Sequence, residues 1–286
     1  MISIILILLF VFSVLSVPVC HGVISGLYLY GMKIFPGLFI SFILTNILVR
    51  ILQQKNINNP WILVITGLMT GFPNGAYICS WYNKNNPENR LGDMLAGIIN
   101  IPSPAFLISY VYINILEKCI SLPMFLALTY TPVILCSYMA ILFFRDKDNK
   151  KDNAPHIKTG KKLIFHFFEE AVDSSINTAL TLGAYVIIFS VIVNIIMHFS
   201  QSNTAGLLIS YLFEISNGLA IIKNAGIPMN ITVLLTVLLD AFGGVCIIMQ
   251  TKSICSSYIS IKKYIYQKLV LCIVTLITAM LLIYVL

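Results

Sequence analysis

The sequence has 286 residues, of which 58% are hydrophobic and only 10% are charged. Soluble domains carry about a quarter charged residues, so the composition predicts an integral membrane protein and argues against a soluble enzyme. The formal charge of +7 does not indicate nucleic-acid binding, because the basic residues lie between apolar runs. The seven cysteines are scattered without a Cys-x-x-Cys motif, which predicts small apolar side chains and no metal ligands.

Apolar runs of about 20 residues predict transmembrane helices. In chain order, the continuous runs of this kind are 2–20, 34–52, 94–116, 121–144, 170–198, 228–250 and 265–286. The first run resembles a signal peptide in length. However, no Lys or Arg precedes it and no small-residue cleavage site follows it, so we expect an uncleaved first span.

Two further apolar segments are interrupted in the middle. Segment 61–82 contains Gly-Phe-Pro-Asn-Gly at 71–75, and segment 205–225 contains Glu-Ile-Ser-Asn-Gly at 214–218. Such breaks leave backbone polar groups unpaired at membrane depth, which is tolerated only inside protein or beside a wet cavity. Both segments are therefore expected to be re-entrant helical hairpins that enter and leave on the same side. Two full spans are the alternative.

Positive charge places the basic loop 145–162 on the cytoplasmic side. With the N-terminus inside and two hairpins, fifteen basic residues are cytoplasmic, Lys268 among them, and Lys33, Lys118 and Lys223 are external. With the N-terminus outside and two full spans in place of the hairpins, fourteen basic residues are cytoplasmic and four are external. Charge therefore does not separate the two topologies, and the hairpin prediction depends on the breaks.

The order of the predicted elements repeats along the chain. After an N-terminal helix and connection (1–33), residues 34–144 hold a span, a hairpin and two spans. After a basic cytoplasmic linker (145–168), residues 169–286 hold the same order in inverted orientation. The predicted fold is an all-α polytopic membrane protein with about seven transmembrane helices and two re-entrant hairpins. Inverted repeats with interrupted helices are typical of secondary transporters.

Polar residues in and near the helix breaks are the candidates for substrate binding. The asparagines among them carry amides that both donate and accept hydrogen bonds. Carboxylates inside the membrane cost free energy and indicate a substrate hydrogen bond or coupling to a proton or cation, with a structural acid as the alternative. Small residues there can instead serve helix packing. The expected substrate-binding set is Asn74, Gly75, Asn100, Ser103, Glu214, Asn217, Gly218 and Asp240.

No catalytic residue, cofactor or metal is expected, because the sequence holds no serine-hydrolase, zinc-protease or nucleotide-binding motif. The expected partners are a small-molecule substrate and the lipid bilayer of the cell membrane. A coupling proton or cation and assembly into a homo-oligomer are left open. Nucleic acid is not an expected partner.

Several motifs occur in a characteristic order. They are Gly71-Phe72-Pro73-Asn74-Gly75-Ala76, the stretch 100–106, Glu170-Ala171-Val172 with Ile176-Asn177-Thr178, Phe213-Glu214-Ile215, and Phe242-Gly243-Gly244 with Gln250. Over roughly residues 30–260, this order resembles the sporulation integral membrane protein YlbJ family, which carries a nucleoside-recognition or gate domain. Pro102-Ser103-Pro104 replaces the Ser-Gly-Pro usual in that family, and Ile248 stands where a histidine is common.

The resemblance implies a protein of spore-forming bacteria whose fold is related to concentrative nucleoside transporters. It also implies a location in the mother-cell or outer forespore membrane and movement of dipicolinic acid toward the forespore. The expected function is therefore transport of a small organic solute during sporulation. The alternatives are a nucleoside or other metabolite transporter of the same fold, and a sporulation membrane scaffold that transports nothing.

Overall fold

The computed structural model describes residues 13–55, 59–86, 90–145, 161–200, 204–255 and 258–284, together with residues 2, 3, 6 and 10. Within these residues the chain forms helices and no strands. In chain order they are α2 (Ser16–Tyr28), η1 (Leu29–Ile34), α3 (Phe35–Lys55), α4 (Pro60–Thr70), α5 (Asn74–Asn85), α6 (Leu91–Ile99), α7 (Pro104–Phe106), η2 (Leu107–Ile115), α8 (Leu122–Arg145), α9 (Lys161–Ser200), α10 (Thr204–Phe213), α11 (Ile215–Asn224), α12 (Met229–Phe242), α13 (Gly244–Cys255) and α14 (Ile261–Tyr284). The segments η1 and η2 are π-helical.

The described residues contain five helical segments that are long and apolar enough to cross a membrane. They are Leu91–Ile115, Leu122–Phe143, Phe168–Ser200, Met229–Cys255 and Ile261–Leu282. The prediction of an all-α polytopic membrane protein is therefore confirmed. The described residues thus give five candidate spans, or six if the bent pair Ser16–Ile34 and Phe39–Leu48 counts as one, where the sequence predicts about seven. Residues 146–160 of the predicted cytoplasmic linker lie outside the described residues.

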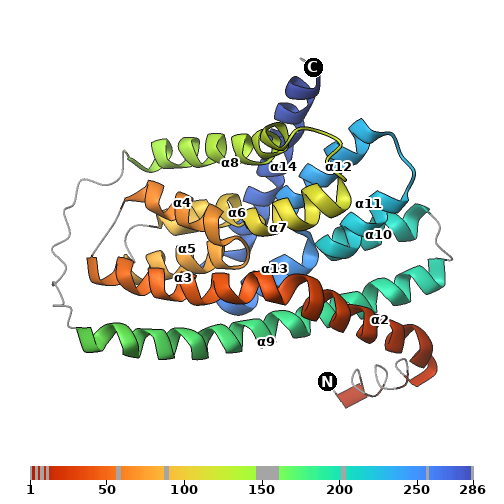
Figure 1. Ribbon diagram of the computed structural model, residues 1–286, viewed down its shortest axis with the longest axis horizontal. Coiled ribbons are helices and arrows are strands. Elements are labelled where there is room, and N and C mark those ends of the chain that lie inside the picture. Colours follow the sequence, from red (N-terminus) through yellow and green to blue (C-terminus); the bar gives the residue numbers. More distant parts are fainter. Residues whose placement is uncertain are drawn as a thin grey trace.

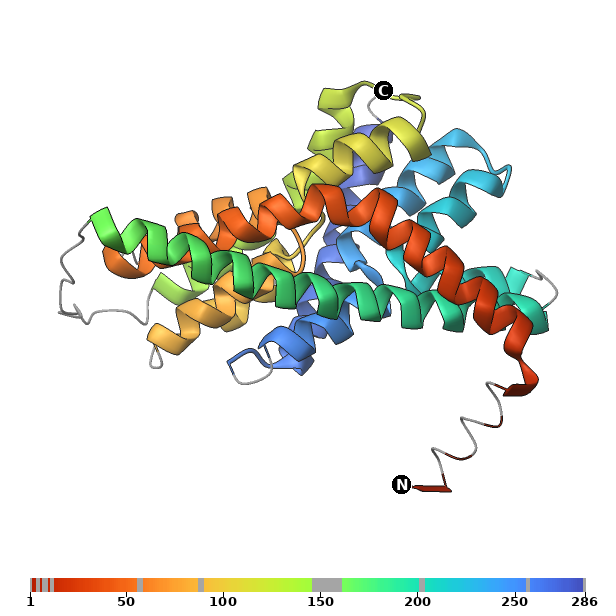
Figure 2. The same ribbon diagram turned by 60° about the horizontal axis from the view of Figure 1, so that its bottom comes forward.

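The first helices account for the difference in number. Residues 4, 5, 7–9, 11 and 12 of the expected span 2–20 lie outside the described residues, and from Ser16 onward α2, η1 and α3 follow one another without a loop. Gly22 and Gly26 lie against α9, so closely that a Cβ on Gly22 would come within 2.5 Å of the Cα of Val191. Small residues allow this close helix packing, and residues 21–33 contain no proline to end the helix. Figure 2 shows the resulting helix crossing α9.

The two halves of the molecule contain the same sequence of elements. Each has a long helix (α3 or α9), a pair of short helices packed together (α4–α5 or α10–α11), a broken helix (α6 followed by α7–η2, or α12 followed by α13) and a final helix (α8 or α14). In Figure 1 the pairs α4–α5 and α10–α11 lie at opposite ends of the molecule, and their connecting turns point toward its centre. This is the inverted arrangement that the sequence predicts.

Local sequence explains where the first hairpin turns. The helix α4 begins at Pro60 after the cap Asn59, whose side chain accepts a hydrogen bond from the Trp61 N–H at 2.9 Å. It ends at Gly71, whose φ of +71° favours glycine. A Cβ on Gly71 would lie 2.4 Å from the backbone nitrogen of Ser103. The tip of the first hairpin therefore rests on the break between α6 and α7.

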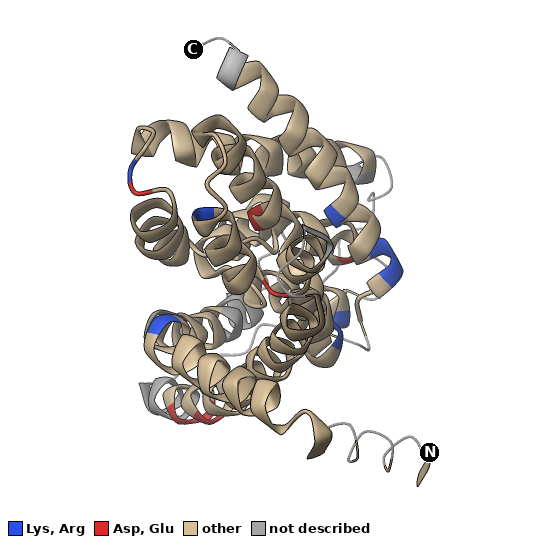
Figure 3. Ribbon diagram, turned by 90° about the vertical axis from the view of Figure 1, so that its right-hand side faces the viewer, with Lys and Arg blue, Asp and Glu red and all other residues tan. Residues whose placement is uncertain are grey.

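Charged residues are sparse on the ribbon, as Figure 3 shows. Among the described residues, the buried charged side chains are Asp93, Glu214, Asp240 and Lys268. Lys268, which is counted in the sequence with the basic residues outside the spans, lies inside the candidate span Ile261–Leu282. The helix α14 begins at Ile261, so Lys268 lies two turns inside it and is 0% exposed.

Candidate functional site

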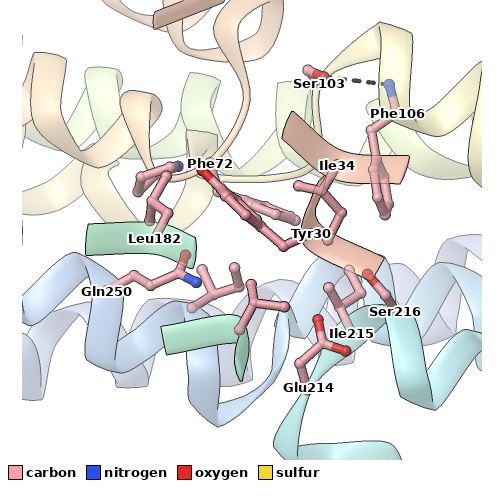
Figure 4. Close-up of a pocket in the computed structure, with 13 residues that line it drawn as sticks. Tyr30, Ile34, Phe72, Ser103, Phe106, Leu182, Glu214, Ile215, Ser216 and Gln250 are labelled. Atoms are coloured by element: carbon pink, nitrogen blue, oxygen red, sulfur yellow. Dashed lines mark hydrogen bonds between the residues drawn. The ribbon is translucent and has the colours of Figure 1, made fainter. Parts of the chain in front are cut away.

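A pocket lies at the centre of the molecule, where the tips of the two hairpins approach each other (Figure 4). Its lining residues are Tyr30, Ile34, Phe72, Pro73, Ser103, Phe106, Leu182, Val186, Glu214, Ile215, Ser216, Ile247 and Gln250. They come from η1 and α9, from both hairpin tips, from the break before α7 and from α13. We call this space the tip pocket. Both repeats therefore contribute to one site.

The tip pocket is small. The centres of water molecules can occupy about 30 Å³ of it, which is room for about two water molecules. Tyr110 of η2 also donates a hydrogen bond to the Ser216 carbonyl at 3.2 Å, which ties the first repeat to the tip of the second hairpin. An organic solute would therefore need a movement of the hairpin tips in order to enter.

Three half-helices begin at the tip pocket. Pro73 is the N-cap of α5, Ser103 is the N-cap of α7, and Glu214 is the N-cap of α11. Helix N-termini carry partial positive charge and free N–H groups, so they favour a negatively charged or hydrogen-bond-accepting partner. The starts of these helices therefore bring partial positive charge to the pocket, and among the described residues that line it there is no Lys or Arg.

The polar side chains of the pocket belong to Ser103, Glu214, Ser216 and Gln250. Glu214 is 2% exposed, and its Oε2 accepts a hydrogen bond from the Asn217 N–H at 2.7 Å. The Ser103 hydroxyl accepts from the Phe106 N–H at 3.3 Å and keeps its own proton to donate. Figure 4 shows Ser103 and Glu214 on opposite sides of the pocket, and Gln250 lies at a third side.

Aromatic rings form much of the remaining wall. Tyr30, Phe72 and Phe106 line the pocket, and the centroids of the Phe72 and Phe106 rings are 6.2 Å apart. Phe106 also packs on Tyr110 with a centroid distance of 5.1 Å. Apolar and aromatic walls with a few polar groups are the usual composition of a site for a small organic ligand.

The structure places only two of the predicted site residues, Ser103 and Glu214, on the wall of the tip pocket. Asn100 is 0% exposed and lies behind the first hairpin. Its Oδ1 accepts from the Ala76 N–H at 3.2 Å, and its Nδ2 donates to the Tyr264 hydroxyl at 2.8 Å. Its amide thus joins the first hairpin to α14.

Asn74 and Gly75, at the start of α5, are buried against this same region. A Cβ on Gly75 would lie 2.9 Å from the Ile99 carbonyl oxygen, so the glycine permits close contact with the end of α6. The Nδ2 of Asn74 is buried and has no hydrogen-bond partner among the described residues. Both residues therefore lie beside the tip pocket without lining it.

Asn217 and Gly218 hold the second hairpin in place. The Asn217 Nδ2 donates to the Ser190 hydroxyl of α9 at 3.3 Å. A Cβ on Gly218 would come within 2.6 Å of the Tyr211 carbonyl oxygen in α10, so the two arms of the hairpin touch there.

Asp240 lies in α12, away from the tip pocket, and is 0% exposed. Neither of its carboxyl oxygens has a hydrogen-bond partner among the described residues, and the same is true of the neighbouring hydroxyl groups of Tyr130 and Thr236. A buried carboxylate without a partner is costly, which keeps the prediction of a proton or cation at this position open.

The sequence analysis does not single out the aromatic wall or Gln250 as a site residue. Tyr30 lies in the segment 21–33, which was expected to be a connection, so its place on a helix facing α9 could not be seen. Phe106 carried a local signal, since it follows the cap Ser103 by three residues and therefore lies in the first turn of the helix that begins at Pro104. Gln250 is a polar residue inside an apolar helix, two turns beyond Gly243-Gly244.

Comparisons with family models, with curated proteins and with solved structures give no match for this chain. The fold and the pocket therefore define the class. The chain is a multi-pass helical membrane protein with two inverted units, and a pocket lies where the hairpin tips of the two units meet.

Proposed function

We propose that the chain is a carrier that moves a small organic solute across the cell membrane. The observation that carries the proposal is the tip pocket, which is walled by both inverted repeats and by both hairpin tips. Sites at the interface of inverted repeats, formed by interrupted helices, suit alternating access, because displacement of either half opens the site to one side.

The substrate that we propose is a small planar carboxylate. The starts of α5 and α7 bring partial positive charge to the pocket, and the Ser103 hydroxyl can donate a hydrogen bond to a carboxylate. Glu214 already caps α11, so that third N-terminus is occupied. The rings of Phe72 and Phe106 suit an aromatic heterocycle.

Dipicolinic acid, a pyridine ring with two carboxylates, has this chemistry. The resemblance to the YlbJ family leads to the same substrate and adds its setting, which is transport toward the forespore across the outer forespore membrane. Two competing functions remain. One is a nucleoside carrier of the same fold, and the other is a membrane scaffold without transport; uptake of a panel of solutes distinguishes them.

The experiment is uptake by proteoliposomes that contain the purified chain. We expect labelled dipicolinate to enter faster than nucleosides and faster than into empty liposomes. Preference for a nucleoside would replace the substrate but keep the carrier. Failure of the whole panel of small carboxylates, nucleosides and other metabolites would favour the scaffold.

Substitutions at the tip pocket connect uptake with this site. Removing the Ser103 hydroxyl should weaken substrate binding roughly tenfold, since one hydrogen bond contributes about 1–2 kcal/mol. Ser103→Ala is matched by Ser109→Ala, which changes an exposed serine of the same broken helix.

Glu214→Gln should also reduce uptake, whereas Glu169→Gln on the exposed part of α9 should not. Equal uptake by all four variants would place the substrate elsewhere.

A further inference from the structure

A second polar centre lies on α14. The ammonium group of Lys268 is fully buried and donates hydrogen bonds to the carbonyl oxygens of Asn100 at 2.5 Å and of Ala241 at 2.9 Å. Asn100 is the C-cap of α6, and Ala241 lies in the last turn of α12. One side chain therefore bonds to the carboxyl ends of the first halves of both broken helices. We call this arrangement the Lys268 junction.

The chemistry of the junction is that of a cation site. The last carbonyl groups of a helix have no partner within the helix and carry partial negative charge. Two such ends meet at Lys268, and among the residues that the structure describes no carboxylate forms an ion pair with it. The Tyr264 ring lies 5.8 Å from the Nζ atom and contributes a further cation-binding surface.

Neighbouring bonds fix the position of the ammonium group. Gln267, next to Lys268 on α14, donates to the Asp93 carbonyl at 2.7 Å and accepts from the Gly97 N–H at 2.7 Å. The Tyr264 hydroxyl accepts from the Asn100 amide, one turn earlier. The helix α14 is thus held along α6 by bonds that point the Lys268 stem at the helix ends. A lysine whose stem only follows apolar surface would instead carry its charge to water.

We propose that the space between the Asn100 and Ala241 carbonyl oxygens is a monovalent-cation site that this chain fills with its own lysine. Backbone carbonyl oxygens are the ligands with which proteins replace the hydration of sodium and potassium. The ammonium of Lys268 takes the position of such an ion, so the two repeats are held together without a bound metal cation. This inference stands whether or not the chain transports a solute.

Thermal unfolding of the full chain in detergent tests the proposal. The wild type should unfold at the same temperature in sodium chloride and in choline chloride of equal concentration. Lys268→Ala should lower the midpoint by roughly 5–15 °C, because two carbonyl groups lose a charged partner. Propylammonium, which restores the deleted atoms, should recover most of this loss, whereas choline is too large to do so. Lys262→Ala, on the exposed side of the same helix, is the control and should change little.

Several outcomes would overturn the proposal. A wild type whose midpoint depends on sodium would show that the lysine does not replace the ion. Recovery of Lys268→Ala by neutral propanol as much as by propylammonium would show that volume, and not charge, is what the site lacks. Lys268→Met fills the space without charge, so wild-type stability of this variant would also refute the site. Because every readout is unfolding, failure here is distinct from failure of uptake.

Discussion

The tip pocket and the Lys268 junction are formed by the same two broken helices, yet their polar groups are arranged in opposite ways. At the junction, carbonyl groups of the first halves bind the Lys268 ammonium. The side-chain amide of Asn100 is also bonded there, through both its oxygen and its nitrogen. At the pocket, the start of α7 and the start of α5 border a space that side chains do not fill.

A break in a membrane helix produces two sets of unpaired backbone groups, carbonyls on one side and N–H groups on the other. In this protein, the first set is satisfied by a side chain of the chain itself. The second set is left in contact with a cavity. The comparison leads to an expectation: changes at the junction should alter stability, and changes at the pocket should alter transport.

The largest effect is expected at Gly71, where the tip of the first hairpin lies against Ser103. Its positive φ and the short approach to the Ser103 backbone leave no room for a Cβ atom. Gly71→Ala should therefore cost about 3–5 kcal/mol in unfolding free energy, from backbone strain and a steric clash together. Chemical unfolding in detergent measures it, with Gly31→Ala as the control because open space surrounds that glycine. Wild-type stability of Gly71→Ala would contradict the seating of the hairpin tip on the break.

A somewhat smaller loss is expected for Asn100→Ala. The substitution removes bonds to the Ala76 N–H and the Tyr264 hydroxyl and leaves both partners buried, which should cost about 2–4 kcal/mol. Exposed Asn85 provides the matched control. The affinity of the folded variant for substrate should stay unchanged. A stable Asn100→Ala protein with weakened binding would return Asn100 to the substrate site, where the sequence analysis expects it.

Asp240→Asn should change stability by less than about 1 kcal/mol, because the amide keeps the shape and removes a buried charge that has no partner in the described residues. If this carboxylate couples transport to a proton or cation, the variant should also lose the pH or cation dependence of uptake. Uptake across a pH series and in different cations measures this. Identical profiles for the wild type and the variant would exclude coupling through Asp240.

The smallest effect is expected far from both regions, at the surface ion pair between Glu117 and Lys223, whose atoms are 2.7 Å apart. The hydrogen bond and the positive charge of Lys223 lower the pKa of the Glu117 carboxyl below its usual value. Any stabilisation of the folded protein by this ion pair is thus present above the usual pKa of a glutamate. It is lost as the pH falls through the lowered pKa of Glu117. Exposed ion pairs contribute little to stability, so Glu117→Gln should have the same unfolding midpoint as the wild type near neutral pH. A clear midpoint difference there would contradict this.

Much of the fold could be predicted from the sequence because its signals are local. Gly71 and Pro73 interrupt one apolar segment and Glu214 interrupts another, so both hairpins and the repeat were visible without knowledge of any contact. The site was harder to predict because its contacts are distant in sequence. The partner of the Asn100 amide is Tyr264, 164 residues further along the chain, and no spacing rule connects the two.

The burial of Lys268 was missed for a different reason. Counting basic residues treats every lysine near the end of a span as a marker of the cytoplasmic side. In the structure, the buried face of α14 recurs every three or four residues at Tyr264, Lys268, Leu271 and Thr275. Because apolar residues occur on every side of this helix, the sequence does not mark this face, and the junction could not be predicted from it.

The length of α9 has a consequence for the membrane around the protein. Its apolar part, Phe168–Ser200, has 33 residues, which makes it roughly 50 Å long, whereas the hydrocarbon core of a bilayer is about 30 Å thick. The helix can lie inclined to the membrane normal, thicken the lipid next to it, or extend into water at the end that carries Glu169, Glu170 and Asp173. Because α2 and α3 pack along α9, they must follow its inclination. Shorter acyl chains should therefore increase the tilt of α9 together with that of α2 and α3.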